Sequence, residues 1–145
     1  MVTFKARKTG RPPVGITYKS KKNFGAEELE KLFLSVQWES GQFPEKLVTA
    51  MQNSGAVFSA WDGDRLIGLI NALDDGALTA YVHYLLVNPE HQGKGIGKEL
   101  LRLVAEKYKD YLYIILISYD KEVSFYQNCG FSKADGTTPM AITAL

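Results

Sequence analysis

The feature that most constrains the fold is an extended segment that runs through a glycine-rich turn into an amphipathic helix. Residues 78–88 (LTAYVHYLLVN) are rich in aromatic and β-branched side chains and stop before Pro89, which is typical of a strand. Residues 92–98 (QGKGIGK) contain three glycines, and apolar residues then recur at helical spacing from Ile96 to Tyr108. Such a junction exposes the unpaired N–H groups and the positive dipole end of a helix. The sequence therefore predicts a site for a phosphate-bearing ligand at this turn.

The rest of the chain alternates helical and extended segments, which predicts a mixed α/β fold. Asp62-Gly63-Asp64 between two extended runs is a strong hairpin signal. The continuous apolar run at 112–118 (LYIILIS) predicts a strand buried on both faces. The expected elements are a strand at 15–19, helices at 26–38 and 45–52, strands at 56–61, 65–73 and 78–88, a helix at 96–108, a strand at 112–118, a helix at 121–129 and a strand at 140–145. This β-α-α-β-β-β-α-β-α-β order predicts a mostly antiparallel central sheet flanked by helices.

Size and composition limit the alternatives. The 145 residues suit a single domain, at 1–145, and no apolar run approaches the roughly 20 residues of a membrane span. The N-terminus lacks the apolar core of a secretory signal, so we expect a cytoplasmic protein without a membrane partner. Cys129 is the only cysteine, and neither histidine lies at zinc-ligand spacing, so we expect no metal.

The net charge of +1 hides an uneven distribution. Residues 1–26 carry seven basic residues and no acid, which leaves ten basic against sixteen acidic residues in the remainder. A basic arm can tether nucleic acid, but these charges are diluted by threonine, glycine and proline. We therefore expect residues 1–14 to be a poorly ordered basic arm, with no nucleic-acid partner.

Two nucleotide-binding readings of the glycine turn fail on spacing. A nucleoside-triphosphate P-loop has four residues between its first glycine and the Gly-Lys pair, followed by serine or threonine. Here three residues separate Gly93 from Gly97-Lys98, and Glu99 follows. A dinucleotide fold needs G-x-G-x-x-G near the start of a βαβ unit, whereas this run is G-x-G-x-G after three extended segments.

A third reading fits the turn. Gln92-x-x-Gly95-x-Gly97 matches the Gln/Arg-x-x-Gly-x-Gly/Ala pattern that wraps the pyrophosphate of coenzyme A, and Leu-x-Val-x-Pro precedes it at residues 85–89. With this motif the sequence resembles the GCN5-related N-acetyltransferase (GNAT) family. Residues 125–131 (FYQNCGF) resemble the second signature of that family at the usual distance. The resemblance covers about residues 15–145 and implies one N-acetyltransferase domain.

The resemblance implies which residues would bind acetyl-CoA as co-substrate. The backbone of the strand before the turn would take up the pantetheine arm, and the turn and the first helical residues would hold the phosphates. The implied cofactor-binding residues are Leu85, Leu86, Val87, Gln92, Gly93, Lys94, Gly95, Ile96, Gly97 and Lys98. Leu85 and Val87 also suit the core, and the two lysines also suit a solvated surface.

Tyr126 and His83 are the catalytic candidates. Tyr126 matches the general-acid tyrosine of the family, whose phenol has a pKa near 10 and protonates the departing thiolate. Many members carry a glutamate base on the strand before the turn, but this strand has no acid and carries His83 instead. In this respect the sequence resembles the arylalkylamine N-acetyltransferases, which carry a histidine at this position and a second one at the position of Tyr81. His83 shares strand parity with Tyr81 and Leu85, and a structural role for it stays open.

Acceptor recognition is less determined. Trp38, Phe43, Tyr81 and Tyr84 are the candidate substrate-binding residues, with helix packing as the alternative for the first two. The leading acceptor is a small-molecule primary amine. Protein lysine or N-terminal amines stay open, as do a non-catalytic CoA-binding module and a homodimer. We expect His91 to be exposed in the turn.

Overall fold

The structure is a computed structural model that describes residues 15–143. The expected basic arm at 1–14 lies outside the described residues. The strands are β1 (Thr17–Ser20), β2 (Ala56–Asp62), β3 (Arg65–Asp74), β4 (Thr79–Val87) and β5 (Tyr113–Leu116). The helices are α1 (Ala26–Ser35), α2 (Pro44–Asn53), α3 (Ile96–Lys107) and α4 (Val123–Asn128), with short 3-10 helices at Glu39–Gln42, Pro89–His91 and Asp120–Glu122.

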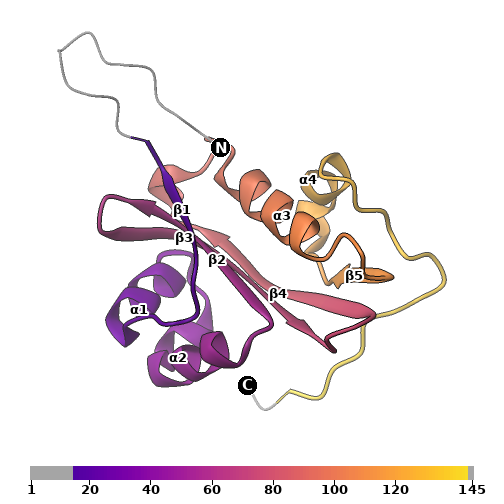
Figure 1. Cartoon of the computed structure of the whole chain (residues 1–145), viewed down its shortest axis with the longest axis horizontal. Helices are drawn as coiled ribbons and strands as arrows, with labels where there is room; N and C mark the ends of the chain where they lie inside the picture. Colours follow the sequence, from indigo (N-terminus) through magenta and orange to yellow (C-terminus); the bar gives the residue numbers. More distant parts are fainter. Residues whose placement is uncertain (1–14, 144–145) are drawn as a thin grey trace, which may run out of the picture.

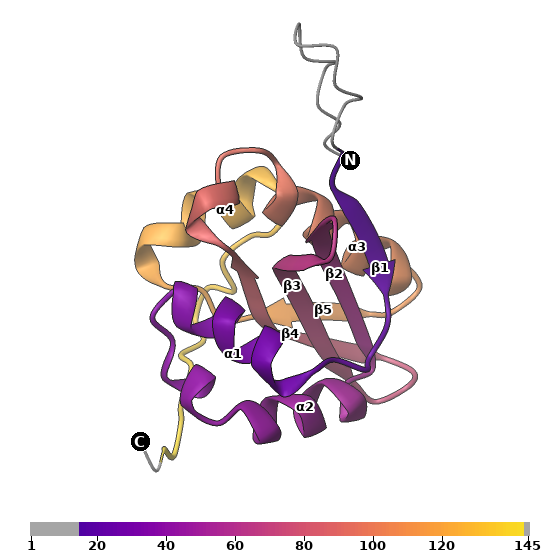
Figure 2. The same cartoon turned by 90° about the vertical axis from the view of Figure 1, so that its left-hand side faces the viewer.

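The described strands form one mixed sheet between two layers of helices. The strand order is β1-β2-β3-β4-β5; β1 to β4 are antiparallel to one another in succession, and β5 is parallel to β4. Helices α1 and α2 lie on one face of the sheet, and α3 and α4 lie on the other (Figures 1 and 2). The expected α/β class with a mostly antiparallel sheet is confirmed.

Each helical layer buries its own core against the sheet, because strand side chains alternate between the two faces. The core on the α3 side includes Ile70, Ala80, Val82, Leu100 and Val104. The core on the α1–α2 side includes Leu29, Phe33, Met51, Leu69 and Leu86. The apolar periodicity that predicted α1 and α3 is therefore the periodicity of their buried faces.

Strand β4 contains a bulge that changes which side chains share a face. Ile70 pairs with Leu85 and Ala72 pairs with Val82, so β4 has one more residue than β3 between the two pairs. Val82 and Leu85 both contact the α3-side core, although an unbroken strand would place them on opposite faces. His83 therefore shares a face with Tyr81 but not with Leu85. The prediction that His83 and Leu85 share a face is wrong, because the bulge reverses the alternation of side chains along β4.

Strand β5 departs from the sequence prediction. It has four residues and lies at the sheet edge, where Tyr113 is 56% and Ile115 is 48% exposed. The expectation of a strand buried on both faces is wrong: Ile114 and Leu116 pack against the α3-side core, whereas Tyr113 and Ile115, which alternate with them and point to the other face, are exposed. The last expected strand is also missing: residues 140–143 are not in a strand. A strand is defined by its place in a sheet, and the described sheet consists of β1 to β5 without this segment.

The sheet splits where β4 leaves β5. The two strands pair only over Thr79–Val82 and Tyr113–Leu116, whereas β4 continues to Val87. The outer edge of β4 after Val82 is consequently not covered by a strand among residues 15–143. This opening leads directly to the glycine turn.

Candidate active site

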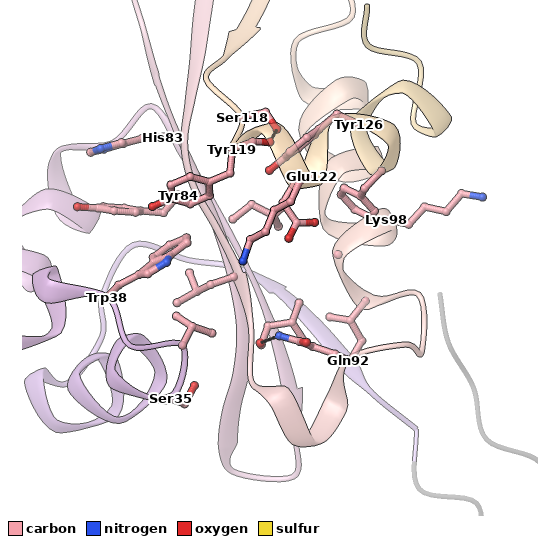
Figure 3. Close-up of a pocket in the computed structure, with 18 of the residues that line it drawn as sticks. Ser35, Trp38, His83, Tyr84, Gln92, Lys98, Ser118, Tyr119, Glu122 and Tyr126 are labelled. Atoms are coloured by element: carbon pink, nitrogen blue, oxygen red, sulfur yellow. Dashed lines mark hydrogen bonds between the residues drawn. The ribbon is translucent and has the colours of Figure 1, made fainter. Parts of the chain in front are cut away.

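A cleft of about 1200 Å³ opens where β4 and β5 diverge. The second half of β4 and the start of α3 line it, together with the connection after α1 and the segment from Ile117 into α4. Figure 3 shows Trp38, His83 and Tyr84 on one side of the cleft and Ser118, Tyr119 and Tyr126 on the other. The cleft therefore brings together segments that are far apart in the sequence.

The glycine turn forms one end of the cleft. Gly93 and Gly95 have φ angles of 78° and 79°, in the left-handed region that only glycine adopts without strain, and Gly95 caps the N-terminus of α3. The Gln92 Nε2 atom donates a hydrogen bond of 2.9 Å to the Val87 carbonyl oxygen, which ties the turn back to β4. The first N–H groups of α3 thus adjoin a cleft, as an anion site requires.

His91 does not lie where we expected it. Its side chain is buried, at 7% exposure, and its Nε2 atom is 3.2 Å from Asp62 Oδ2 at the end of β2. The expectation of an exposed His91 is wrong because Pro89–His91 form a 3-10 helix that folds this residue against the β2–β3 hairpin. The His91–Asp62 contact therefore holds the segment before the glycine turn against the sheet.

Of the ten residues expected to bind the cofactor, nine line the cleft and Lys94 does not. Ile96 is only 1% exposed, so its side chain belongs to the core, and only its backbone is available to a ligand. Leu85 and Val87 likewise pack against the α3-side core. The Lys98 side chain points away from the centre of the cleft (Figure 3).

Tyr126 extends from α4, and its hydroxyl points into the cleft (Figure 3). Burial raises the pKa of this phenol above 10, and the nearby Glu122 carboxylate acts in the same direction. The phenol therefore keeps its proton at neutral pH. A protonated hydroxyl facing a cleft is suited to donate a hydrogen bond or a proton.

His83 stands on the opposite wall within a group of aromatic rings. Its imidazole stacks on Tyr84 at 4.0 Å between ring centroids and lies 5.7 Å from the Tyr81 ring. Desolvation lowers the pKa of His83 below 6.5, so the imidazole is mostly neutral at pH 7. Stacking of the adjacent His83 and Tyr84 is a consequence of the bulge, since neighbours in a regular strand point to opposite faces.

The expected acceptor residues are only partly brought together. Trp38, Tyr81 and Tyr84 line the cleft, whereas Phe43 does not and is instead 38% exposed, with Lys46 Nζ 5.2 Å from its ring centroid. The Trp38 and Tyr84 ring centroids are 5.8 Å apart, so two of the expected residues form one aromatic wall.

Two polar residues at this wall were not predicted from the sequence. Asn71 in β3 is 1% exposed, and its Oδ1 atom accepts a 2.9 Å hydrogen bond from the Tyr84 backbone N–H at the bulge. Its Nδ2 atom donates to Ser54 Oγ at 3.1 Å, after the end of α2. Ser40 Oγ accepts a 3.2 Å hydrogen bond from the Tyr84 hydroxyl. The only sequence signal for Asn71 is its polarity within the apolar run of residues 66–73.

Comparison with known proteins identifies the family. A model of the acetyltransferase (GNAT) family matches residues 24–131, which is most of the chain. The chain belongs to the GNAT family. It is 30% identical over 128 residues to an uncharacterized N-acetyltransferase ycf52 of Pyropia yezoensis, covering 83% of this chain and 73% of that protein. It is 32% identical over 111 residues to an uncharacterized N-acetyltransferase ycf52-like protein of Prochlorococcus marinus, covering 72% and 61%.

Solved structures agree with the family. A GNAT family acetyltransferase from Streptococcus pneumoniae TIGR4 superposes with a TM-score of 0.77 at 30% identity, covering 90% of this chain and 99% of that one. This GNAT protein is accordingly an acyltransferase, an N-acetyltransferase by family, and the family uses acetyl-CoA. Within residues 15–143, no group of three or more His, Cys, Asp or Glu residues is placed to hold a metal ion. No described helix is long and apolar enough to cross a membrane.

The cleft has the features that acetyl-CoA needs. A phosphate group fits the left-handed glycines and free N–H groups at the start of α3. An extended amide-bearing arm fits the outer edge of β4 after Val82, which β5 does not pair with, in the way that an added strand would. Both features open into the same cleft, which also contains Tyr126.

Proposed function

We propose that this GNAT protein transfers the acetyl group of acetyl-CoA directly to the primary amine of a small molecule. The observation that carries the proposal is the single cleft that unites the glycine turn, the open edge of β4, Tyr126 and His83. Acetyl-CoA supplies the activated thioester. The backbone of Gln92–Lys98 would hold its phosphates, and the backbone of residues 85–87 would hold its pantetheine arm.

His83 is the base in this proposal. An alkylammonium has a pKa near that of lysine, about 10.4, so an acceptor amine must lose a proton before or during attack. The lowered pKa of His83 supports the role, because a neutral imidazole is already able to accept that proton at pH 7. Two carboxylates, Glu39 and Glu122, also line the cleft, but neither lies on β4, the strand that carries the base in many family members.

Tyr126 is the acid. Its phenol is protonated at neutral pH, so its hydroxyl can donate a proton to the sulfur of the departing thiolate. Tyr126 and His83 come from opposite walls of the cleft (Figure 3). An acid and a base on opposite walls suit a reaction in which one group gains a proton as another loses one.

The aromatic wall supports an amine with a cationic or apolar body as the acceptor. Faces of tyrosine and tryptophan attract cations and pack against apolar groups. Trp38, Tyr81 and Tyr84 provide three such rings beside His83. Arylalkylamines have both a cationic amine and an apolar ring. They are also the acceptors of the enzymes that this sequence resembles at His83.

The decisive experiment is a screen for thiol release from acetyl-CoA. The panel contains arylalkylamines, polyamines, amino sugars and lysine-bearing peptides, because one relative, from Glycine max, is named histone acetyltransferase TAP1. We expect a small amine to give the highest kcat/KM and Tyr126→Phe to reduce kcat while acetyl-CoA affinity stays within about 2-fold. Tyr111→Phe, outside the cleft, is the matched control.

Two results would contradict the proposal. Preference for peptides over every small amine would assign a protein acceptor instead. Tight acetyl-CoA binding without thiol release for any amine would indicate a CoA-binding module. The cytoplasmic location stays a prediction; one relative, from Arabidopsis thaliana, is named chloroplastic.

A further inference from the structure

Two side-chain pairs within residues 15–143 join the β2–β3 hairpin to the 3-10 helix at Pro89–His91, which leads into the glycine turn. Arg65 Nη1 donates a 2.9 Å hydrogen bond to Glu90 Oε2, and both side chains are more than half exposed. His91 Nε2 lies 3.2 Å from Asp62 Oδ2, and here the side chains are only 9% and 38% exposed. The two pairs come from the same hairpin and reach adjacent residues, so they differ chiefly in burial.

The His91 ring contains a buried polar atom without a partner among residues 15–143. A carboxylate oxygen can only accept a hydrogen bond, so Nε2 carries the hydrogen and donates it to Asp62. The other ring nitrogen, Nδ1, is buried and makes no hydrogen bond within the described chain. An unpaired buried polar atom costs stability, and a phenylalanine ring would occupy a similar volume without that cost. Packing therefore does not explain a histidine at this position, whereas the contact of Nε2 with Asp62 does.

His91 and Ile96 are the buried residues that flank the glycine turn, and residues 92–95 between them are all exposed. A side chain added at Gly93 would meet no atom within 4 Å, so packing does not fix the turn from within. Glycine also has little conformational preference of its own. Ile96 is held by the α3-side core, and His91 is held by Asp62. The shape of the turn is therefore set mainly from its two ends.

We propose that Asp62 and His91 are positioning residues of the cofactor site: their contact holds the glycine turn in the shape that binds the phosphates of acetyl-CoA. Several backbone N–H groups must point at one anion, and each hydrogen bond weakens steeply as its angle departs from linear. A turn anchored at one end only would adopt shapes in which these groups diverge. Asp62 does not line the cleft, so it acts through His91. The inference rests on the proposed cofactor site at residues 92–98, but on neither the acceptor nor the roles of His83 and Tyr126.

Isothermal titration calorimetry with CoA tests the proposal. Asp62→Ala removes the acceptor of the hydrogen bond, and His91→Phe removes the donor but keeps a ring. We expect each to weaken CoA binding by about 10-fold, as for the loss of one hydrogen bond to a charged group. Asp62→Asn keeps an oxygen that accepts the same bond, so its CoA affinity should stay within about 3-fold of the natural value. The double variant Asp62→Ala/His91→Phe should bind no more weakly than either single variant, because both changes remove the same contact.

Arg65→Ala is the matched control, because it breaks the neighbouring exposed pair with Glu90 on the same 3-10 helix. Exposed pairs contribute little, so its CoA affinity should stay within about 2-fold of the natural value. Pantetheine, which has the arm of CoA but no phosphate, is the second probe. Ligand-detected NMR should give the same pantetheine affinity for the natural chain and for every variant, because the Asp62–His91 contact positions only the phosphate end.

The outcomes separate this inference from the proposed function. Unchanged CoA affinity in both Asp62→Ala and His91→Phe overturns the inference alone, because CoA then binds without the contact. Equal losses for CoA and pantetheine also overturn it, since the contact then supports the whole fold. If the natural chain itself does not bind CoA, the inference and the proposed function fail together. Circular dichroism checks folding; if His91→Phe does not fold, Asp62→Ala, which changes a side chain that is 38% exposed, decides the test.

Discussion

His83 shows how one side chain acquires its properties from its neighbours. The sequence alone makes it a histidine on a strand, with an ordinary pKa near 6.5. The bulge sets its ring against Tyr84 and Tyr81, and the loss of water lowers the pKa. Tyr126 is affected in the opposite direction, because burial favours the neutral form of both groups. Each residue is thereby kept in the protonation state its proposed role requires.

Replacing His83 with alanine should lower kcat/KM by about 10²-fold near neutral pH, the usual contribution of a general base. The pKa of His83 lies below 6.5, so in the natural protein the rate should fall as the pH drops through that pKa and the base becomes protonated. The variant should lack this limb of the pH profile. A loss of equal size at all pH values would instead assign His83 a structural role.

At the scale of the element, the turn from β4 to α3 depends on backbone shape. Gly95→Val should reduce coenzyme A affinity by at least about 10-fold, because a β-branched residue at φ of 79° is strained by about 1–3 kcal/mol and its side chain adjoins the phosphate site. Calorimetry measures the affinity. Gly63→Val, with φ of 60° and open space around it in the β2–β3 turn, is the matched control. Unchanged binding by the Gly95 variant would remove the turn from the CoA site.

The bulge of β4 depends on a side chain of β3. Asn71→Leu removes the acceptor for the part-buried Tyr84 N–H, so the free energy of unfolding should fall by about 1–3 kcal/mol. Turnover should fall too, because His83 adjoins the bulge. Urea unfolding and steady-state kinetics measure the two effects. Ser54→Ala keeps the Asn71–Tyr84 bond and is the control; equal kinetic losses in both variants would argue against a specific role for Asn71.

For the whole molecule, stability in acid should depend on α3. The pKa of Glu99 is lowered from 4.5 to about 2, and the largest of the causes is its hydrogen bonding to Arg102, at 2.8 and 2.9 Å. A lowered carboxyl pKa adds stability above pH 4.5, and that stability is lost as the pH falls towards 2. Arg102→Met should therefore lower the unfolding temperature at pH 7 and move acid unfolding to higher pH.

Thermal unfolding between pH 7 and pH 2 measures this effect. Lys31→Met is the matched control, because Lys31 forms an ion pair with Glu27 in which both side chains are more than 70% exposed. Exposed pairs contribute little, so this variant should follow the natural profile. Identical pH profiles for the two variants would contradict the role of Glu99.

The sequence by itself determined the elements and the ligand class. Nine of the ten expected elements occur, because apolar periodicity follows from which face is buried, and that face repeats with the geometry of the helix or strand. The glycine spacing and residues 125–131 indicated the family that comparison later identified. These properties are local: each element and each motif is carried by residues that are close together in the sequence.

Only the tertiary structure decided what depends on contacts between distant segments. His83 and Leu85 lie on opposite faces because β4 bulges between Val82 and Leu85, where Asn71 of β3 accepts a hydrogen bond from the Tyr84 N–H. His91 is buried because Asp62 lies beside it. The apolar run at 112–118 contains a strand, as predicted, but it is an edge strand with one exposed face, because apolar side chains alone do not specify how many faces of a strand the fold will cover.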